Sequence, residues 1–595
     1  MKFSLKMLTL LSTIIIDRQN KHKNILNNNN LNIKYYDYIV VGSGASGTTV
    51  AARLAENSKT TVLLLEAGSN QNIYNDIPAF ESKLSETQQN WNYPTVSQKY
   101  AHFSYVDNRS NIKQGRVLGG STAINSMNYY RECPDYYSLW SDITGVKGWS
   151  YAEVLPFFLK TENNLDNKLV AIESKYHKSG GELTVTTPVI DVILKNYIIA
   201  SKQLGYKWTH MDGRNPMGTT YMQKMIDSNG FRQSIAKVFL ENRNHKNLKI
   251  LVNSLVTKIL FNYIKKAIGV EVYRNSKIYQ VFANKEVIIS AGAIGSPKLL
   301  MLSGIGPSDH LEELNIPVVS DLKVGYNMIY SPIIDSNTIS FDIINQSLVE
   351  KPLKTFENIY NFFVNNSGPL RNKVSGVTCF PEMSYNSTYP QLSNGCVLSR
   401  TSYLGTDLDA MVAHYKHPDQ WRQYFSPYLN RTSLSLLALI KRAKSVGRIQ
   451  LASIDPLEEP IIDPCLFCNE NDIDDLVKTI KLALKIYTST HMKQKIKPYK
   501  YPIPGCTPCP NNYFCDTYLK CIVQANTDWV LPMGGCRIGV SPDTDAVVDE
   551  NFKVFGVSNL RVIDSSIIPV ATETINAISI MIGEYGVHKI LNNNT

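Results

Sequence analysis

A glycine-rich segment and one acidic residue have the types and spacing needed to bind a dinucleotide. Gly42 permits a tight turn, Gly44 lets the backbone approach a pyrophosphate, and Gly47 lets a helix pack closely on a strand. Glu66 follows Gly47 by 19 residues and is expected to accept hydrogen bonds from ribose hydroxyls. The same contact region is predicted to include the neighbouring residues Val41, Ser43, Ala45, Ser46, Leu65 and Ala67.

Two strands and a helix must position these residues. The apolar runs 36–41 and 61–65 predict strands, and residues 48–56 between them have a helical pattern. The free N–H groups and the positive dipole end at the start of that helix would face the phosphates. A glycine triplet alone is weak evidence, but strand, glycines, helix, strand and acid in this order favour a dinucleotide site.

Three further segments resemble a known family. Residues 115–125 and 292–307 are similar to the two signature motifs of the glucose-methanol-choline (GMC) oxidoreductases, and residues 559–569 resemble that family's closing FAD-binding strand. The resemblance extends over residues 36–590. It implies an α/β protein, α+β overall, in which a Rossmann-like FAD-binding domain is interleaved with a substrate domain built on an antiparallel sheet.

The resemblance also assigns further residues to FAD. Gly119, Gly120 and Asn125 are expected near the flavin ring, Val256 near the adenine, and Asp564 near the pyrophosphate or ribityl chain. Each could instead serve the local fold alone. The matched cofactor contacts are completed by Arg116 and Ala577.

The residue before Asn125 bears on how FAD is held. Some members of the family attach FAD covalently through a histidine at that position, and here it is Ile124. Isoleucine cannot form the bond, so the resemblance implies noncovalent FAD.

The position of the family's catalytic base is occupied by an apolar residue. A histidine commonly accepts the hydroxyl proton while hydride leaves the carbinol carbon for the flavin. The family pattern His-Pro-Val-Gly-Thr-Cys reads here Leu531-Pro532-Met533-Gly534-Gly535-Cys536, and no histidine lies between His491 and His588. A histidine from the substrate domain could still fold into the site.

The second member of the family's catalytic pair matches Asn576. Its amide can hydrogen-bond a substrate oxygen or a developing alkoxide, but it cannot accept the proton as a base. The alternative role for Asn576 is to cap a helix.

Other departures from the family gather near this pair. Residues 324–331 read Val-Gly-Tyr-Asn-Met-Ile-Tyr-Ser where the family commonly has Val-Gly-Glu-Asn-Leu-Gln-Asp-His, and residues 573–575 replace a usual glycine. We therefore expect a flavoprotein that is inactive or strongly impaired as an alcohol oxidoreductase. Two alternatives are an active oxidase or dehydrogenase of small CH–OH donors with a relocated base, and a non-redox, hydroxynitrile-lyase-like activity.

The dispersed motifs predict discontinuous domains. The FAD-binding domain is expected to comprise residues 36–160, 229–324 and 511–591, and the substrate domain residues 161–228 and 325–510. Residues 445–451 are expected to form one of the substrate domain's strands.

Composition limits the function classes. The chain has 595 residues, 43% of them hydrophobic and 19% charged, so a globular protein with more than one core is expected. The net charge of +10 is scattered, which argues against nucleic acid as a partner. No transmembrane span and no metal site are expected, and the sequence leaves the oligomeric state open.

Residues 1–35 precede the first strand. Two lysines and the apolar stretch 7–16 resemble a secretory signal, but no small-residue cleavage site follows, and a polar tether is the alternative. Location is thus open between secretion, an endomembrane compartment and, for a viral origin, the virion.

Ten cysteines are present, and seven of them lie within residues 465–536. The pairs Cys465/Cys468 and Cys506/Cys509 have zinc-site spacing, although the gap between the pairs is long. The cysteines could also form local disulfides in an oxidising compartment, or they could remain reduced thiols.

Overall fold

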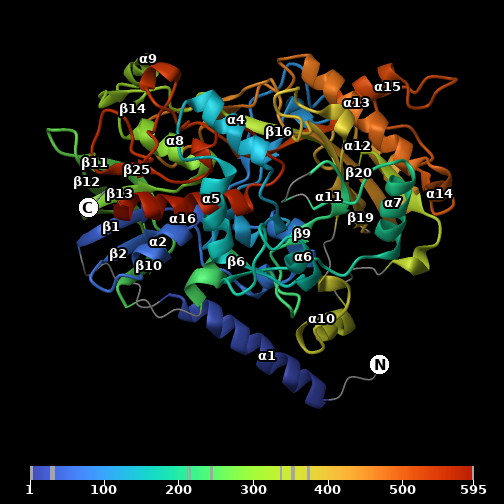
Figure 1. Cartoon of the computed structure of the whole chain (residues 1–595), viewed down its shortest axis with the longest axis horizontal. Helices are drawn as coiled ribbons and strands as arrows, with labels where there is room; N and C mark the ends of the chain where they lie inside the picture. The colour runs from blue at the N-terminus through green and yellow to red at the C-terminus, as the bar shows by residue number, and fades with distance from the viewer. Residues whose placement is uncertain are drawn as a thin grey trace.

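The structure is a computed structural model that describes residues 5–26, 34–210, 212, 216–241, 246–335, 338–349, 355–371, 375–405 and 407–592. It is a mixed helix and sheet protein with two large sheets (Figure 1). The predicted N-terminal segment is described only at residues 5–26 and 34–35, so its Asn-rich middle lies outside the described residues.

The first sheet is built from the start, the middle and the end of the chain. Its strand order is β10-β2-β1-β13-β12-β11, and β25 pairs with β13. Strands β1, β2, β10, β13 and β25 run parallel where they pair, whereas β11, β12 and β13 form an antiparallel meander. The bounds are β1 Tyr35–Val41, β2 Val62–Leu65, β10 Leu248–Leu251, β11 Leu255–Phe261, β12 Ala267–Arg274, β13 Lys277–Ile289 and β25 Leu560–Val562.

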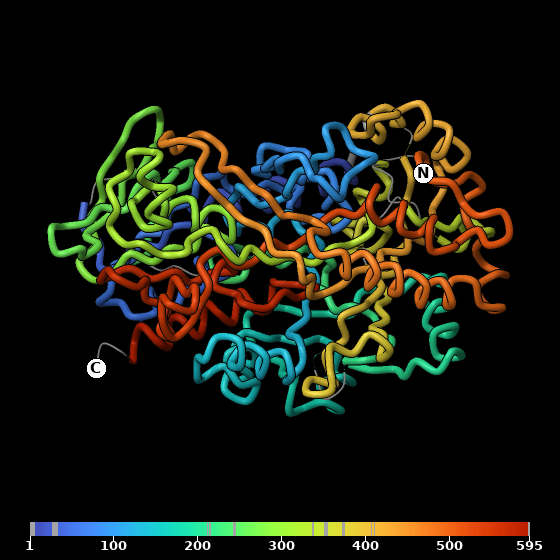
Figure 2. The backbone as a smooth tube through the Cα atoms, turned by 90° about the horizontal axis from the view of Figure 1, so that it is seen from above, coloured from blue at the N-terminus to red at the C-terminus, as the bar shows by residue number. Residues whose placement is uncertain are grey.

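The predicted strand-helix-strand unit is present in this sheet. Helix α2 (Ala45–Leu54) connects β1 to β2 and packs against α16 (Asn576–Asn592). The expected start of the helix at residue 48 was three residues too late, because the helix begins directly after Gly44, whose extended backbone forms the N-cap. In Figure 2 the early, middle and late parts of the chain lie together at one end of the molecule.

The second sheet is largely antiparallel. Its order is β23-β17-β20-β19-β18-β8, with β16 joining β20 to β24. Helices α7 (Val192–Gln203) and α13 (Asn471–Tyr487) pack on it. The strand bounds are β8 Gly218–Tyr221, β16 Ile329–Ile334, β17 Ser340–Ile343, β18 Gly376–Cys379, β19 Gly395–Tyr403, β20 Thr432–Ile440, β23 Ile496–Pro498 and β24 Thr527–Met533.

Two strand pairings bear on the expected domains, whose bounds stay a prediction. Strand β24, within the stretch expected for the FAD-binding domain, is hydrogen-bonded to β16 of the second sheet. The strand expected at residues 445–451 is shorter, β21 (Arg448–Gln450), and it pairs only with β22 (Ile461–Asp463).

Further helices and short strands complete the fold. The helices are α1 Leu5–Asn24, α3 Glu81–Leu84, α4 Pro134–Thr144, α5 Tyr151–Thr161, α6 Asn167–Ile172, α8 Gly292–Leu302, α9 Ser308–Glu313, α10 Phe356–Phe363, α11 Leu408–Val412, α12 Pro418–Phe425, α14 Thr490–Lys493 and α15 Asp516–Asn526. The short strands are β3 Tyr93–Pro94, β4 Asn111–Ile112, β5 Asn128–Tyr129, β6 Glu162–Asn164, β7 Leu183–Val185, β9 Gln223–Lys224, β14 Ile305–Gly306 and β15 Ser320–Asp321. Among the described helices, none has both the length and the hydropathy that crossing a membrane requires.

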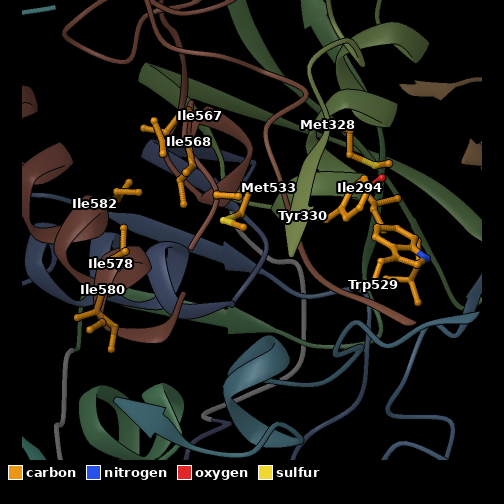
Figure 3. Close-up of a cluster of buried hydrophobic side chains, with 14 of the residues drawn as sticks. Ile294, Met328, Tyr330, Trp529, Met533, Ile567, Ile568, Ile578, Ile580 and Ile582 are labelled. Carbon is orange, nitrogen blue, oxygen red and sulfur yellow. The ribbon is translucent and has the colours of Figure 1, made fainter. Parts of the chain in front are cut away.

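The core continues from one sheet to the other. Tyr330 and Trp529, from the paired strands β16 and β24, make an edge-to-face contact with ring centroids 5.4 Å apart. Figure 3 shows them with Met533 and with Ile578 of α16, and all four side chains are buried. The four side chains belong to one continuous buried apolar cluster.

Eight cysteines form disulfides in the structure. The pairs are Cys379–Cys396, Cys465–Cys468, Cys506–Cys521 and Cys509–Cys515. Three of them lie within the cluster for which zinc was an alternative, and there the structure has the local-disulfide arrangement. Cys133 and Cys536 are buried thiols.

Candidate cofactor and active site

The glycine loop follows β1 and approaches neighbouring backbone closely. Gly42 has a φ of +96°, and a Cβ added to it would lie 2.3 Å from the Ser290 carbonyl oxygen. A Cβ on Gly47 would lie 2.0 Å from the carbonyl oxygen of Gly42. A Cβ on Gly44, in contrast, would meet no atom within 4 Å. Two glycines therefore close the turn, and the third faces open space.

Glu66 joins this loop to the next strand. Its Oε2 accepts hydrogen bonds from the Ser43 amide (3.0 Å) and hydroxyl (2.6 Å), and its Oε1 accepts from the Gly68 amide (2.8 Å). Burial raises the pKa of Glu66, and these donors oppose the rise. The Ser43 hydroxyl also accepts a hydrogen bond from the Gly119 amide at 3.2 Å. The structure thus brings together three residues that were predicted from separate motifs.

The remaining predicted cofactor residues lie around the same loop. Ser46 donates to the carbonyl of Ser579 on α16 (2.7 Å), close to buried Ala577. Val256 lies in β11, two residues after Ser254, whose amide donates to the Glu66 carbonyl (2.8 Å). Buried Val41 and Leu65 end β1 and β2, half-buried Ala45 begins α2, and Ala67 follows Glu66. A Cβ added to Gly120 would lie 2.7 Å from the Gly44 Cα. Arg116 is exposed, and its guanidinium lies over the ring of Trp91.

Asp564 has more protein partners than the sequence indicated. Its Oδ2 accepts from the Gly292 amide (2.8 Å) and the Ser296 hydroxyl (2.5 Å), and its Oδ1 accepts from the amide and hydroxyl of Ser566. These bonds tie the end of β25 to the start of α8. The contact of Asp564 with FAD stays a prediction.

Leu531 lies where β24 bulges away from its regular pairing with β16. Ile329 pairs with Met533 and Ser331 with Val530, so β24 contains one extra residue between these pairs. Leu531 is half-buried, precedes Pro532, and has a φ of +59°. A left-handed conformation is unusual for leucine and points to a local geometry that the surrounding fold imposes.

The two departures from the family motif are neighbours in space. Strand β16 carries Tyr330 and Ser331, and it is the pairing partner of the strand that carries Leu531. Ser331 donates hydrogen bonds to the carbonyls of Lys441 and Thr572, each at 3.0 Å. The side chains of Tyr330 and Ser331, at positions where the family commonly has polar residues, are therefore buried in the protein interior.

Asn576 begins α16, and both the oxygen and the nitrogen of its side-chain amide form hydrogen bonds. Its Oδ1 accepts from the Nδ2 of Asn125 (2.8 Å), and its Nδ2 donates to the Asn128 carbonyl (2.8 Å). Asn125 in turn accepts from the Met127 amide (2.9 Å). The structure thus pairs the predicted flavin-contacting asparagine with the predicted catalytic asparagine.

The histidines of the described part take no part in this amide pair. His177 lies beside Glu162 with its Nδ1 3.0 Å from the carboxylate, and His310 accepts from the Leu451 amide. Buried His102 and exposed His414 pack against Tyr105. His245 lies outside the described residues.

A buried ionic cluster beside Asn576 was not predicted. Lys441 Nζ lies 3.3 Å from Glu573 Oε2 and 3.6 Å from Glu132 Oε1, and Tyr130 donates to Glu132 (3.0 Å). Burial raises the pKa of Glu573 to about 7, against the charge of Lys441. Although burial opposes it, the charges of Lys441 and Arg442 lower the pKa of Glu132.

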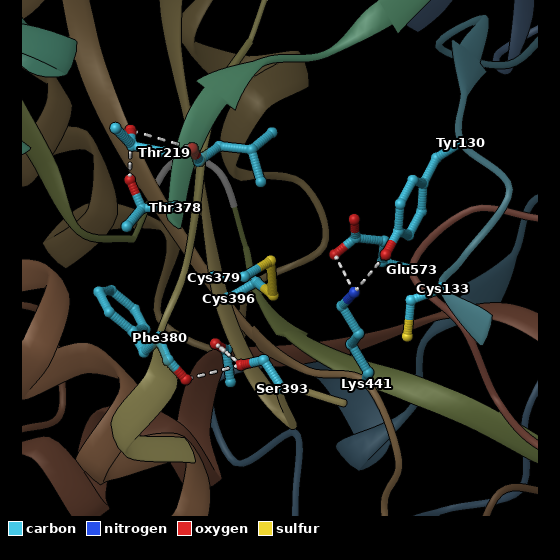
Figure 4. The surroundings of a disulfide bond; sticks show 12 residues. Tyr130, Cys133, Thr219, Thr378, Cys379, Phe380, Ser393, Cys396, Lys441 and Glu573 are labelled. Atoms are coloured by element: carbon cyan, nitrogen blue, oxygen red, sulfur yellow. Dashed lines mark hydrogen bonds and ion pairs between the residues drawn. A yellow bond between two sulfur atoms is a disulfide. The ribbon is translucent and has the colours of Figure 1, made fainter. Parts of the chain in front are cut away.

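Figure 4 shows part of this cluster next to the Cys379–Cys396 disulfide. The sequence indicated residues 573–575 only as the place of a missing glycine. Glu132 and Lys441 carried no signal, because their association depends on chain segments that are far apart in sequence.

Comparisons with known proteins agree with this architecture. Residues 36–333 and 443–583 match the N-terminal and C-terminal models of the GMC oxidoreductase family. The chain belongs to this family. Glucose dehydrogenase [FAD, quinone] of Drosophila melanogaster is 32% identical to this chain, and the match covers 93% of this chain and 86% of the dehydrogenase. Ecdysone oxidase of Bombyx mori is also 32% identical, and the match covers 92% of this chain and 80% of the oxidase.

A crystal structure of formate oxidase shares the fold. It superimposes with a TM-score of 0.79 at 23% identity, covering 94% of this chain and 99% of the other. Family membership and such flavoenzyme neighbours imply FAD as the cofactor.

The residues present fit that cofactor. The free space beside Gly44, at the N-terminus of α2, can receive a pyrophosphate, and the carboxylate of Glu66 lies at the end of the neighbouring strand. FAD, when bound, would accept a hydride from an oxidisable substrate. The protein residues would hold the cofactor and exclude water from the site.

Proposed function

We propose that this GMC family protein binds FAD noncovalently and is inactive or strongly impaired as an alcohol oxidoreductase. The observation that carries the proposal is Leu531, at the position of the family's base histidine. General base catalysis contributes roughly 10²–10⁴-fold to rate, and leucine offers no proton acceptor. Ile124, at the position of the histidine used for covalent attachment, supports noncovalent binding.

The contacts of Asn576 support the same conclusion. Its amide is bonded to Asn125 and to the Asn128 carbonyl, and no histidine of the described residues joins this network. An amide can orient a substrate oxygen but cannot take up its proton. The site therefore retains a hydrogen-bonding group without the base that the family reaction uses.

The visible spectrum of the purified protein tests this proposal. We expect oxidised flavin that acid precipitation releases into solution, and whose spectrum does not change when primary, secondary or aryl alcohols are added without oxygen. Bleaching of the flavin by any of these alcohols at a rate typical of enzymes would overturn the proposed inactivity. A protein that contains no flavin, even after incubation with FAD, would overturn the binding.

A second candidate is oxidation of a small CH–OH donor with a relocated base. It is favoured by Glu573, which lies three residues before Asn576. Burial raises the pKa of Glu573 to about 7. If bleaching is seen, Glu573→Gln should abolish it, whereas Glu550→Gln at an exposed position should not. Unchanged bleaching in Glu573→Gln would reject Glu573 as that base.

A further inference from the structure

The N-terminal helix α1 occupies an apolar groove of the body. Leu11 is 6% exposed and belongs to a cluster with Phe231, Phe362 and Phe363. The cluster also contains Ile73, Ile77, Phe80 and Leu370. Figure 1 shows α1 lying along the outside of the molecule, with its N-terminal end close to α10.

The docking face of α1 has a helical spacing. Leu11, Ile15, Arg18 and His22 follow one another at intervals of four, three and four residues, and they are buried or half-buried. Leu8 and Ile16 point away and are 43% and 55% exposed. The face that contacts the body is therefore selected by the sequence of α1.

The charges of the helix match those of the groove. Asp76, whose side chain is 2% exposed, lies 3.2 Å from Arg18 Nη1 and 3.4 Å from His22 Nε2. Lys237 Nζ is the third partner, at 3.1 Å. Although burial opposes it, these cations hold the pKa of Asp76 well below its usual range. The Arg18 guanidinium also lies 3.3 Å from the ring centroid of Phe231.

The segment under α1 supports the loop predicted to face the flavin. Gln71 Nε2 donates to the Leu118 carbonyl at 2.6 Å, and Asn75 Nδ2 donates to the Ala123 carbonyl at 3.1 Å. Arg232 donates to the carbonyls of Asn75 (2.9 Å) and Asn125 (2.5 Å). Asp76 bonds the helix, while Gln71 and Asn75 of the same segment bond the backbone before and after Gly119 and Gly120.

We propose that α1 remains part of the folded protein, docked in this groove, and that its docking helps to retain FAD. The second part rests on the proposed FAD binding. Without α1 the groove would expose several aromatic side chains, and Asp76 would lose two of its three basic partners, Arg18 and His22. The apolar stretch that resembles a secretory signal would then be a docking helix, which stabilises the flavin loop through residues 70–76.

The test compares charge substitutions on the two faces of α1 in the full-length protein. Leu11→Asp places a carboxylate in the apolar cluster, whereas Leu8→Asp, the matched control, places it in solvent. We expect Leu11→Asp to speed the release of FAD by about tenfold and to make α1 sensitive to protease, with Leu8→Asp behaving like the wild type. Equal FAD release and equal proteolysis in the two variants would overturn the proposal.

A milder pair covers the case in which Leu11→Asp fails to fold. Arg18→Gln removes the ion pair and the ring contact, whereas Lys21→Gln removes only an exposed pair with Asp17. Faster FAD release in Arg18→Gln alone supports the proposal, and equal rates contradict it. Intact mass must show residues 5–24 in the purified protein, and their loss would overturn it. If the wild type binds no FAD, the proposed function and the retention role fail, whereas proteolysis still tests the docking.

Discussion

Asn125 donates a hydrogen bond from Nδ2 to Oδ1 of Asn576 over 2.8 Å, and Asn576 donates in turn to the Asn128 carbonyl at the same distance. The two asparagines come from positions 451 residues apart, and the sequence predicts one as a flavin contact and the other as a catalytic residue. Asn576 is buried and Asn125 is half-buried, and each amide satisfies one polar atom of the other. The pair is therefore structural, whatever it also does for a substrate.

Replacing Asn576 with alanine should destabilise the protein. The change leaves the Asn125 amide and the Asn128 carbonyl without their partner, and an unsatisfied buried polar group costs about 1–3 kcal/mol. Urea unfolding of the apoprotein would measure the change in the free energy of unfolding. Asn592→Ala, at the exposed end of α16, is the control and should have almost no effect. Equal stability of the two variants would contradict a structural role for Asn576.

Alanine at Gly42 and at Gly44 should separate folding from cofactor binding. In Gly42→Ala the new methyl would lie 2.3 Å from the Ser290 carbonyl oxygen at a φ of +96°, so we expect a loss of roughly 1–3 kcal/mol in unfolding free energy. In Gly44→Ala the methyl meets no protein atom within 4 Å, so the apoprotein should keep its stability and lose FAD. The ratio of flavin to protein after gel filtration measures the second effect. Full FAD occupancy in Gly44→Ala would show that the cofactor does not lie beside this residue.

Glu573 should make stability depend on pH. Burial, opposed by Lys441 and Arg442 and reinforced by Glu132, raises its pKa from 4.5 to about 7. Between these values the folded protein holds a proton that the unfolded chain releases, so the free energy of unfolding falls as pH rises through this window. Glu573→Gln should reduce this fall by about 3 kcal/mol between pH 4.5 and 7, measured by urea unfolding at several pH values.

Asp528→Asn is an informative comparison for Glu573→Gln. Burial raises the pKa of Asp528 from 3.8 to about 6. The stability that protonated Asp528 contributes is therefore lost at a lower pH than the contribution of Glu573. If Glu573→Gln leaves the whole pH profile unchanged, Glu573 does not carry a raised pKa in the folded protein.

The family and the first sheet could be predicted because their signals are local. The glycines between β1 and α2 restrict the backbone directly, and apolar runs such as β2 reflect burial on both faces of a parallel sheet. Leu531 could be predicted to stand at the base position because Pro532, Gly534 and Cys536 set the register of the motif.

Contacts across long sequence separations could not be predicted. The ion pairs of Lys441 with Glu132 and Glu573 form because the end of β20, the segment after β5 and the segment before α16 converge. From sequence alone, a single charged residue is expected to be exposed to solvent. The docking of α1 was also hidden, because an apolar stretch of ten residues has the same composition in a signal and in an amphipathic helix.

Restoring the histidine at position 531 should rescue little activity. Leu531 lies in a bulge with a φ of +59°, and its pairing strand β16 carries Tyr330 and Ser331, whose side chains are buried. Leu531→His returns a proton acceptor to β24 without restoring the polar residues that the family has on β16. We therefore expect anaerobic flavin reduction by alcohols to increase by less than about tenfold, compared with the roughly 10²–10⁴-fold that a well-placed base supplies. Leu531→Gln, which is polar but not basic, is the control. Rapid flavin reduction in Leu531→His alone would show that one substitution silenced an otherwise intact site, and that the changes in β16 are neutral.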